Sequence, residues 1–293
     1  MDDLIGTGLF YDFIEIGTSD FDTLIQNATA DTLGLSIDPV AHYLDRLPCP
    51  SGCSKLNAAI SDREGEVAVY FVRPDLIQTL GLPDWLRGCN SIGNPHPTVA
   101  SLIKEMKLPA DIVVESRVPM YRVQSVLERF NIDGVFFLKL DTEGHDATIL
   151  EEFFESAMVR QYPHQLLFES NILSDNDRIH RLIAKLLLSG YDIVRAETGG
   201  GATDTLLRLN ISRIPDRTRF MPGIRGYYLA GYPAGYDPEQ PPHGNTLAEA
   251  CQYCLATGQG GVTYQFGRYE VREGKFLGEH KSEPELQSWL LMP

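Results

Sequence analysis

Residues 136–154 read FFLKLDTEGHDATILEEFF and are the most informative stretch of the sequence. It opens with an apolar run that lacks helical spacing, as expected of a strand buried on both faces. Lys139 lies inside the run, and alternation along a strand puts it on the same side as Asp141, whose carboxylate can answer its charge. Gly144 ends the strand, and a helix is predicted to begin near His145. Charged groups at the carboxyl end of a central strand occupy the ligand position of open α/β sheets; a buried ion pair that only ends the strand is the alternative.

Other apolar runs along the chain also predict strands. Three upstream runs end in acids, glycine or proline: YDFIEIG (11–17), LGLSIDP (33–39) and KLNAAISDREG (55–65). Three more are predicted over 165–171, 191–197 and 204–210, and the last two must be antiparallel because the short turn GGGA (199–202) joins them. Strands alternate with helices. The sequence therefore predicts an α/β fold with a doubly wound, mostly parallel, Rossmann-like sheet of seven strands and an antiparallel last strand.

The segments between these strands carry the remaining predicted elements. Caps, apolar spacing and breakers define them. They are helices over 21–28 (with Ser19 or Asp20 near its cap), 40–47, 122–130 and 174–188 (capped from Ser174 to Asp177), and strands over 110–118 and over 66–72, the latter a hairpin addition to the sheet edge.

The sequence resembles the FkbM-type methyltransferases, a class I family that uses S-adenosylmethionine. The resemblance rests on EIGTSD (15–20), IDP (37–39), AAISDREGE (58–66) and above all KLDTEGHD (139–146), and it covers roughly residues 10–210. It implies methyl transfer from S-adenosylmethionine and a sheet whose last strand runs against the others. One position departs from the family: the first loop usually carries a second glycine four residues after the first, and this chain has Phe21 there.

The loop after the first strand supplies candidates for binding the amino-acid end of the cofactor. Gly17 allows close backbone approach, and the helix start predicted after it favours the methionyl carboxylate. Thr18 and Ser19 can add hydroxyl donors, and Glu15 can accept from the cofactor's ammonium group. All four are predicted to bind the cofactor.

The next two strand ends supply candidates for the nucleoside. Asp38 ends the second strand, where a carboxylate can accept from both ribose hydroxyls. The alternative for Asp38-Pro39 is a turn. Asp62, with Ser61 beside it, is predicted to meet the adenine edge.

Asp141, Glu143 and His145, at the end of the central strand and just beyond it, are candidates for catalysis. Asp141 is also predicted to contact the cofactor. Histidine is the natural base near neutral pH, although a histidine that caps a helix is equally common. His96 is a second candidate base. Asp141 and Glu169 could bind a divalent ion, but two carboxylates are too few to assert a metal, so none is predicted.

Composition narrows the functional classes. The formal charge of −15 would repel a phosphate backbone, which argues against nucleic acid as a substrate. No run approaches the ~20 consecutive apolar residues of a membrane helix. The first residues, MDDLI, hold acids where a secretory signal holds bases, so a cytoplasmic location is expected. The odd count of five cysteines favours free thiols in a reducing compartment.

The chain is predicted to divide into a methyltransferase domain over 1–232, a linker over 233–244 and a small α+β module over 245–293. Residues 74–100 form an insertion that is read as a lid over the site, with an inert surface loop as the alternative. The C-terminal module is expected to contain a helix and a hairpin that turns near Phe266 and Gly267. It is too small for a secure core of its own, so it should pack on the main domain or on a second copy of the chain.

Three functions compete at this point. The first is an S-adenosylmethionine-dependent methyltransferase that O-methylates a small hydroxylated acceptor such as a sugar or secondary metabolite. The second is a non-catalytic binding or scaffold protein whose cofactor loop Phe21 has closed. The third is a nucleotide-dependent oxidoreductase, against which the absence of GxGxxG after the first strand argues.

Overall fold

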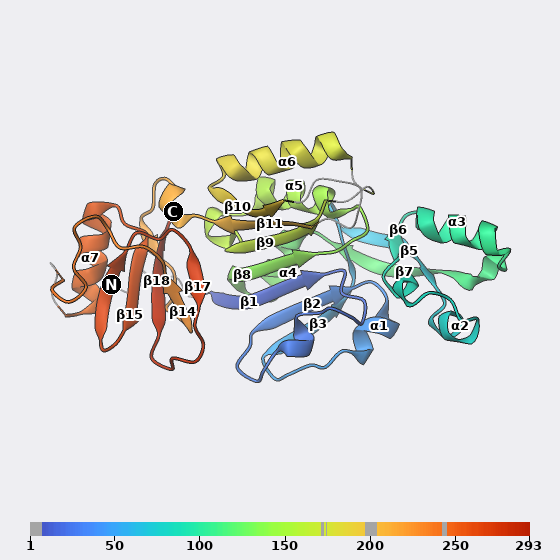
Figure 1. The fold of residues 1–293 in the computed structure, drawn as a ribbon, viewed down its shortest axis with the longest axis horizontal. Helices are drawn as coiled ribbons and strands as arrows, with labels where there is room; N and C mark the ends of the chain where they lie inside the picture. Colours follow the sequence, from blue (N-terminus) through green and yellow to red (C-terminus); the bar gives the residue numbers. More distant parts are fainter. Residues whose placement is uncertain (1–7, 171–172, 174, 197–203, 242–244) are drawn as a thin grey trace.

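The computed structural model describes residues 8–170, 173, 175–196, 204–241 and 245–293. A central sheet lies between the C-terminal module at one end and the insertion at the other (Figure 1). In the described ranges, no helix is long and apolar enough to cross a membrane.

The central sheet has the strand order β10-β11-β9-β8-β1-β2-β3. Strands β1, β2, β3, β8 and β9 pair in parallel, and β11 runs antiparallel to both of its neighbours, as the sequence predicted. The turn predicted at 199–202 lies outside the described residues. The strand bounds are β1 Leu9–Ile16, β2 Gly34–Asp38, β3 Cys53–Asn57, β8 Ile132–Leu140, β9 Gln165–Glu169, β10 Tyr191–Ala196 and β11 Asp204–Leu209.

The two faces of this sheet are covered unequally. Helices α4 (Val123–Arg129), α5 (Asp146–Ser156) and α6 (Asn176–Leu188) pack side by side on one face. Their apolar residues recur three or four positions apart, as in Ile179, Leu182 and Leu186 of α6. Helix α6 is capped by the Asp175 side chain; Ser174 lies outside the described residues. In the part of the chain that the structure describes, the other face is covered by α1 (Ala41–Arg46) and a short 3-10 turn, η2 (Ile25–Asn27), which pack on Phe13.

The helix predicted over 21–28 does not form, because the loop after β1 folds differently. Ser19 and Asp22 adopt positive φ angles of 48° and 52°, which a right-handed helix does not allow. The carboxylate of Glu15 then accepts hydrogen bonds from the amides of Leu24 and Ile25, at 2.6 and 3.2 Å. These bonds hold the chain in the η2 turn. The helix start expected to bind the methionyl carboxylate is therefore absent from this described loop.

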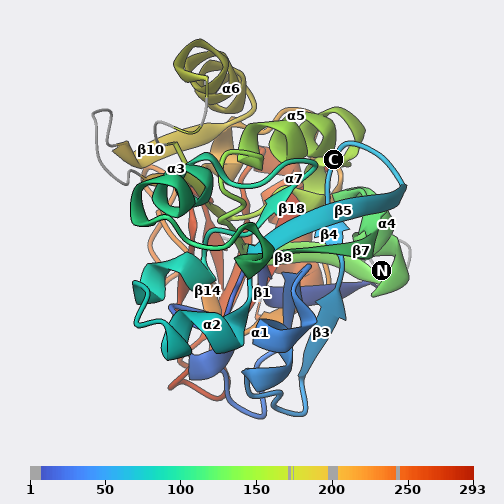
Figure 2. The same cartoon turned by 90° about the vertical axis from the view of Figure 1, so that its right-hand side faces the viewer.

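The insertion predicted over 74–100 is part of a larger unit, residues 59–121, which forms a second sheet with the order β4-β7-β5-β6 and is called the insertion from here on. The strand expected at the edge of the central sheet, β5, instead pairs with β7 and β6, so that prediction was wrong. The insertion has its own apolar cluster around Val72, Leu86 and Ile112, and Figure 2 views it end-on. Its elements are β4 Ala59–Ile60, β5 Gly65–Val72, α2 Pro74–Thr79, η3 Asp84–Arg87, β6 Ser91–Ile92, α3 Pro97–Met106, η4 Ala110–Ile112 and β7 Val113–Tyr121.

The C-terminal module contains the predicted helix and hairpin and additional strands. The hairpin turns at Phe266 and Gly267, whose φ angles of 51° and 76° are those of a type I′ turn. Strands β12, β13 and β14 precede the predicted linker over 233–244, yet they pair with β18 and β17, which follow it. These pairings favour a module boundary nearer residue 215 than 232. The bounds are β12 Arg219–Phe220, β13 Ile224–Arg225, β14 Tyr227–Leu229, α7 Leu247–Thr257, β15 Gly261–Gln265, β16 Arg268–Arg272, β17 Leu277–Glu279 and β18 Gln287–Met292.

The module packs on the main domain at the amino ends of β1 and β8. The Tyr227 ring lies 4.6 Å from that of Phe136 and 5.9 Å from that of Phe10, measured between centroids. Its hydroxyl donates to Asp12 at 2.7 Å, and Lys281 lies 3.0 Å from the same carboxylate. Of the two packing partners that the sequence left open, the structure therefore shows the main domain.

Candidate active site

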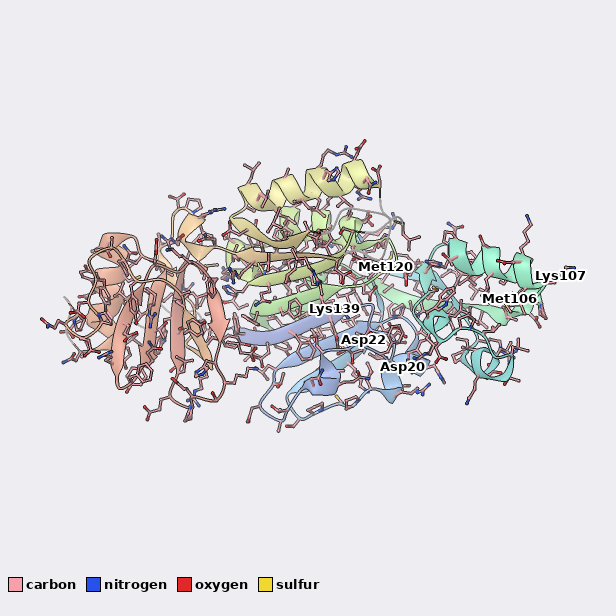
Figure 3. The ribbon with its side chains drawn as sticks, in the orientation of Figure 1. Asp20, Asp22, Met106, Lys107, Met120 and Lys139 are labelled. Atoms are coloured by element: carbon pink, nitrogen blue, oxygen red, sulfur yellow. The ribbon has the colours of Figure 1, made fainter. Side chains whose placement is uncertain are left out.

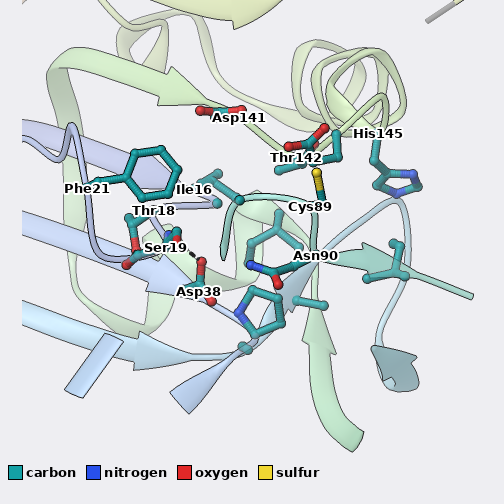
Figure 4. Close-up of a pocket in the computed structure, with 18 of the residues that line it drawn as sticks. Ile16, Thr18, Ser19, Phe21, Asp38, Cys89, Asn90, Asp141, Thr142 and His145 are labelled. Carbon is teal, nitrogen blue, oxygen red and sulfur yellow. Dashed lines mark hydrogen bonds between the residues drawn. The ribbon is translucent and has the colours of Figure 1, made fainter. Parts of the chain in front are cut away.

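A pocket opens at the carboxyl ends of β1, β2 and β8, which is the end of the sheet away from the C-terminal module (Figure 1). Figure 4 shows this pocket at close range. One wall is the loop after β1, a second is formed by the ends of β2 and β3, and a third is formed by the loop after β8. The insertion closes the fourth side. The lining residues are Ile16–Ser19, Phe21, Asp38, Pro39, Ala58–Ile60, Trp85, Gly88–Asn90, Ile92, Asp141–Glu143 and His145.

Gly17 follows β1 and lies against the backbone of Asp141, which follows β8. Its φ angle is +82°, and a Cβ atom placed on it would lie 1.9 Å from the carbonyl oxygen of Asp141. The amide of Asp141 donates to the Ile16 carbonyl at 2.9 Å beside it. Only glycine fits here, and the first reason is contact with Asp141 rather than with a ligand.

Glu15 does not reach the pocket. Its carboxylate is buried and accepts from Leu24, Ile25 and the hydroxyl of Ser36. The burial raises the pKa of Glu15, and the three hydrogen bonds act in the opposite direction. Glu15 thus shapes the loop, and the structure does not bring it to the place where it was expected to accept from an ammonium group.

Thr18 and Ser19 line the pocket, but their polar groups already have partners. The Ser19 amide donates to Asp38 at 2.7 Å, and its hydroxyl donates to the carbonyl oxygen of Arg87 in the insertion at 2.9 Å. The Thr18 hydroxyl donates to the Ser19 carbonyl at 3.2 Å. Ser19 therefore joins the first loop to both β2 and the insertion.

Asp38 lies at the end of β2, as expected, and lines the pocket. Its two carboxylate oxygens accept from the amides of Ser19 and Val40, each at 2.7 Å. Burial raises the pKa of Asp38 to about 6, and these amides partly offset the rise. Each oxygen has a second lone pair, so hydrogen bonds from ligand hydroxyls are compatible with this arrangement.

Phe21 forms part of the pocket wall and contacts the insertion. The guanidinium group of Arg87 lies 5.1 Å from the centre of its ring and forms an ion pair with Asp20. A Cβ atom on Gly88 would lie 3.1 Å from the Phe21 ring. The residue that replaces the family's second glycine thus anchors the insertion over the loop.

Asp141 is exposed within the pocket at the end of β8. Although solvent reaches the carboxylate, desolvation by the surrounding protein raises its pKa to about 7; Lys139 lowers the pKa, and Asp146 and Glu143 raise it further. The ammonium group of Lys139 donates to the backbone carbonyl of Asp22 at 2.9 Å (Figure 3). Lys139 acts on Asp141 through its charge, and the described residues show no direct ion pair between the two.

Glu143 is linked to His96 of the insertion. His96 Nδ1 accepts from the amide of Thr98 and thereby caps α3, so the proton lies on Nε2, which donates to Glu143 at 3.2 Å. Cys89 lies in the same cluster, where one ligand atom from each of the three residues is within 4.8 Å of the others. A metal would need the lone pair of Nε2 and would break the α3 cap, so the geometry fits a hydrogen-bonded link.

His145 lines the pocket, and its ring is oriented by two residues predicted to bind adenine. Ser61 donates to Asp62 at 3.1 Å, so its oxygen accepts from His145 Nε2 at 2.9 Å. This arrangement leaves the lone pair of His145 on Nδ1, and burial lowers the pKa of the ring. Ser61 and Asp62 are not among the described residues that line the pocket, so the structure does not bring them to the expected adenine edge.

Asp146 and Asn90 belong to the site, although the sequence did not predict a functional role for either. Asp146 is fully buried and accepts from the amide and hydroxyl of Thr142 and from the amide of Glu169, which ties β8, α5 and β9 together. An acid in the first turn of a helix was the available signal. Asn90 lines the pocket from the insertion, and nothing in the local sequence marks it.

Comparison with known proteins gives one match. The family model described as the methyltransferase FkbM domain matches residues 15–185, which is more than half of the chain and runs from β1 into α6. No curated protein and no solved structure matches significantly.

Proposed function

The chain belongs to the methyltransferase FkbM domain family, and we propose that it O-methylates a small hydroxylated acceptor, such as a sugar or secondary metabolite, with S-adenosylmethionine as the donor. Membership makes the chain a methyltransferase, which replaces the scaffold and oxidoreductase readings. The family generally uses S-adenosylmethionine; the identity of the acceptor and the methylated atom are the proposed part.

The main support for the proposal is that Asp38 and Asp141 line the same pocket, at the carboxyl ends of parallel strands that both pair with β1. Asp38 offers oxygen lone pairs to ribose hydroxyls, and the loop over 17–19 lies beside it for the amino-acid end. Pro39, Ala58–Ile60 and Ile92 supply apolar walls for a flat base. Acidic groups near Asp141 suit a positively charged sulfonium. The residues present therefore fit the cofactor.

S-adenosylmethionine, when bound, supplies an electrophilic methyl group that an acceptor lone pair can attack in line. The chain's contribution is to orient the acceptor, exclude water and remove its proton. We assign Asp141 to hold the acceptor hydroxyl, and His145 Nδ1 to take the proton, because that nitrogen has the lone pair and the ring is neutral near pH 7. Glu143 stays fixed by His96, which has no nitrogen left to act as a base.

Calorimetry with S-adenosylhomocysteine tests the cofactor assignment. We expect the parent protein to bind, and Asp38→Ala to bind at least tenfold more weakly, about 1.4 kcal/mol, because charge-assisted hydrogen bonds are lost. Asp38→Asn keeps the size of the side chain and one of the two oxygens that accept from the Ser19 and Val40 amides. Asp45→Ala, at an exposed position of α1, is the matched control. A parent protein that does not bind S-adenosylhomocysteine contradicts the proposal, and an unchanged affinity of both Asp38 variants contradicts the ribose assignment.

The acceptor class is tested by incubating the protein and labelled S-adenosylmethionine with panels of hydroxylated and amine compounds. Transfer to hydroxyl compounds supports the proposal, whereas transfer only to amines overturns it. A cytoplasmic location and association of copies through the C-terminal module stay predictions.

A further inference from the structure

Asn90 presents an unsatisfied polar atom to the pocket. It lies between η3 and β6 of the insertion, and Figure 4 draws it in the pocket together with Asp38 and Asp141. Its Oδ1 is buried and has no hydrogen-bond partner within the described part of the chain. A buried acceptor without a donor is destabilising, so a ligand group that donates a hydrogen bond to Oδ1 would bind more tightly than one that does not.

The orientation of the Asn90 amide is determined by its neighbours. Nδ2 donates to the carbonyl oxygen of Arg87 at 2.8 Å, and the same oxygen accepts from the Ser19 hydroxyl at 2.9 Å. A flipped amide would place its oxygen against the Arg87 oxygen, which is repulsive. Oδ1 is therefore the atom left for a ligand.

The surroundings of Asn90 suit a purine that carries an amino group. Pro39 follows the proposed ribose ligand Asp38, and Ile60 and Ile92 add apolar side chains to the same pocket. Of the residues expected at the adenine edge, Ser61 instead forms a hydrogen bond with His145, and Asp62 accepts from Ser61. An apolar slot with one fixed acceptor selects a flat ring with an N–H donor on its edge.

We propose that Asn90 Oδ1 accepts a hydrogen bond from the 6-amino group of the cofactor's adenine, so that the insertion itself recognises the base. The inference rests on the proposed use of S-adenosylmethionine. Asn90 and Ser19 both donate to the Arg87 carbonyl oxygen. Recognition of the base and attachment of the insertion to the first loop therefore depend on the same group of hydrogen bonds.

The test compares two ligands on three proteins by calorimetry. The ligands are S-adenosylhomocysteine and its analogue whose purine lacks the 6-amino group; the proteins are the parent, Asn90→Leu and Asn94→Leu, an exposed asparagine of the same insertion. We expect the parent to bind the analogue roughly 10- to 100-fold more weakly than S-adenosylhomocysteine, because the analogue leaves Oδ1 unsatisfied. Asn90→Leu should lose this preference, with the two ligands within about threefold, and Asn94→Leu should behave as the parent.

Each outcome has one reading. A parent that binds both ligands equally, or an Asn90→Leu protein that keeps the preference, overturns the inference while leaving the cofactor assignment intact. A parent that binds neither ligand overturns the proposed cofactor and, with it, the inference. If Asn90→Leu unfolds, Asn90→Ala takes its place: the two ligands within about threefold support the inference, and a retained preference overturns it.

Discussion

Substitution of Gly17 by alanine should damage the site through the backbone of β8. Alanine at a φ angle of +82° costs about 1–2 kcal/mol relative to glycine. Its Cβ atom would lie 1.9 Å from the Asp141 carbonyl oxygen, so the ends of β1 and β8 must separate by more than 1 Å to reach the 3.0 Å that real contacts require. That movement breaks the hydrogen bond from the Asp141 amide to Ile16, which contributes about 0.5–1.5 kcal/mol. We expect the free energy of unfolding to fall by about 3 kcal/mol.

The matched control is Gly81→Ala. Gly81 also has a positive φ angle, +61°, but nothing lies within 4 Å of the position that its Cβ atom would take, so only the backbone strain of about 1–2 kcal/mol applies. Urea denaturation of both variants isolates the contact with Asp141, and calorimetry with S-adenosylhomocysteine should show a loss of at least tenfold for Gly17→Ala only. Equal destabilisation of the two variants would refute the steric argument.

Three further predictions concern catalysis, the first loop and the core. Asp141→Asn should fold and bind cofactor while methyl transfer falls by ~10²; normal turnover would move the reaction centre elsewhere. Phe21→Gly should bind S-adenosylhomocysteine within about tenfold of the parent, and binding by the glycine variant alone would mean that Phe21 closes the native pocket. His164 is fully buried, which lowers its pKa to about 3. Below pH 6.5 the imidazole is therefore protonated in the unfolded state but stays neutral in the folded state, so the free energy of unfolding falls as the pH falls. Between pH 7 and pH 5 the parent should lose about 2 kcal/mol more than His164→Leu in urea denaturation, and equal losses would contradict the assignment.

The parts of the fold that could be predicted are those determined by neighbouring residues in sequence. The apolar runs of β1, β2 and β8 and the acids that end them were visible, so Asp38 and Asp141 could be placed at one edge of the sheet. The type I′ turn at Phe266 and the cap of α7 are also local features. The strands β12–β14 were missed because each has only two or three residues and takes its pairing from distant strands.

The site could be predicted less completely than the fold, because its side chains form hydrogen bonds with residues that are distant in the sequence. Glu15 binds amides nine and ten residues later, which converts an expected helix into the η2 turn. Ser61 meets His145 across 84 residues, and His96 meets Glu143 across 47. No local pattern reports such pairs. Asn90 lacks any motif, and only its position against Arg87 reveals a role.

The apolar cluster inside the insertion has an evolutionary consequence. Because Val72, Leu86 and Ile112 give this unit a core separate from that of the central sheet, its inward-facing turn can diverge without disturbing β1, β2 and β8. The contacts that such divergence has to keep are the hydrogen bonds of Ser19 and Asn90 to the Arg87 carbonyl oxygen, because they join the insertion to the first loop. Exchange of residues 59–121 between related enzymes is accordingly a route by which one wall of the pocket could change while the walls formed by the strand ends are retained.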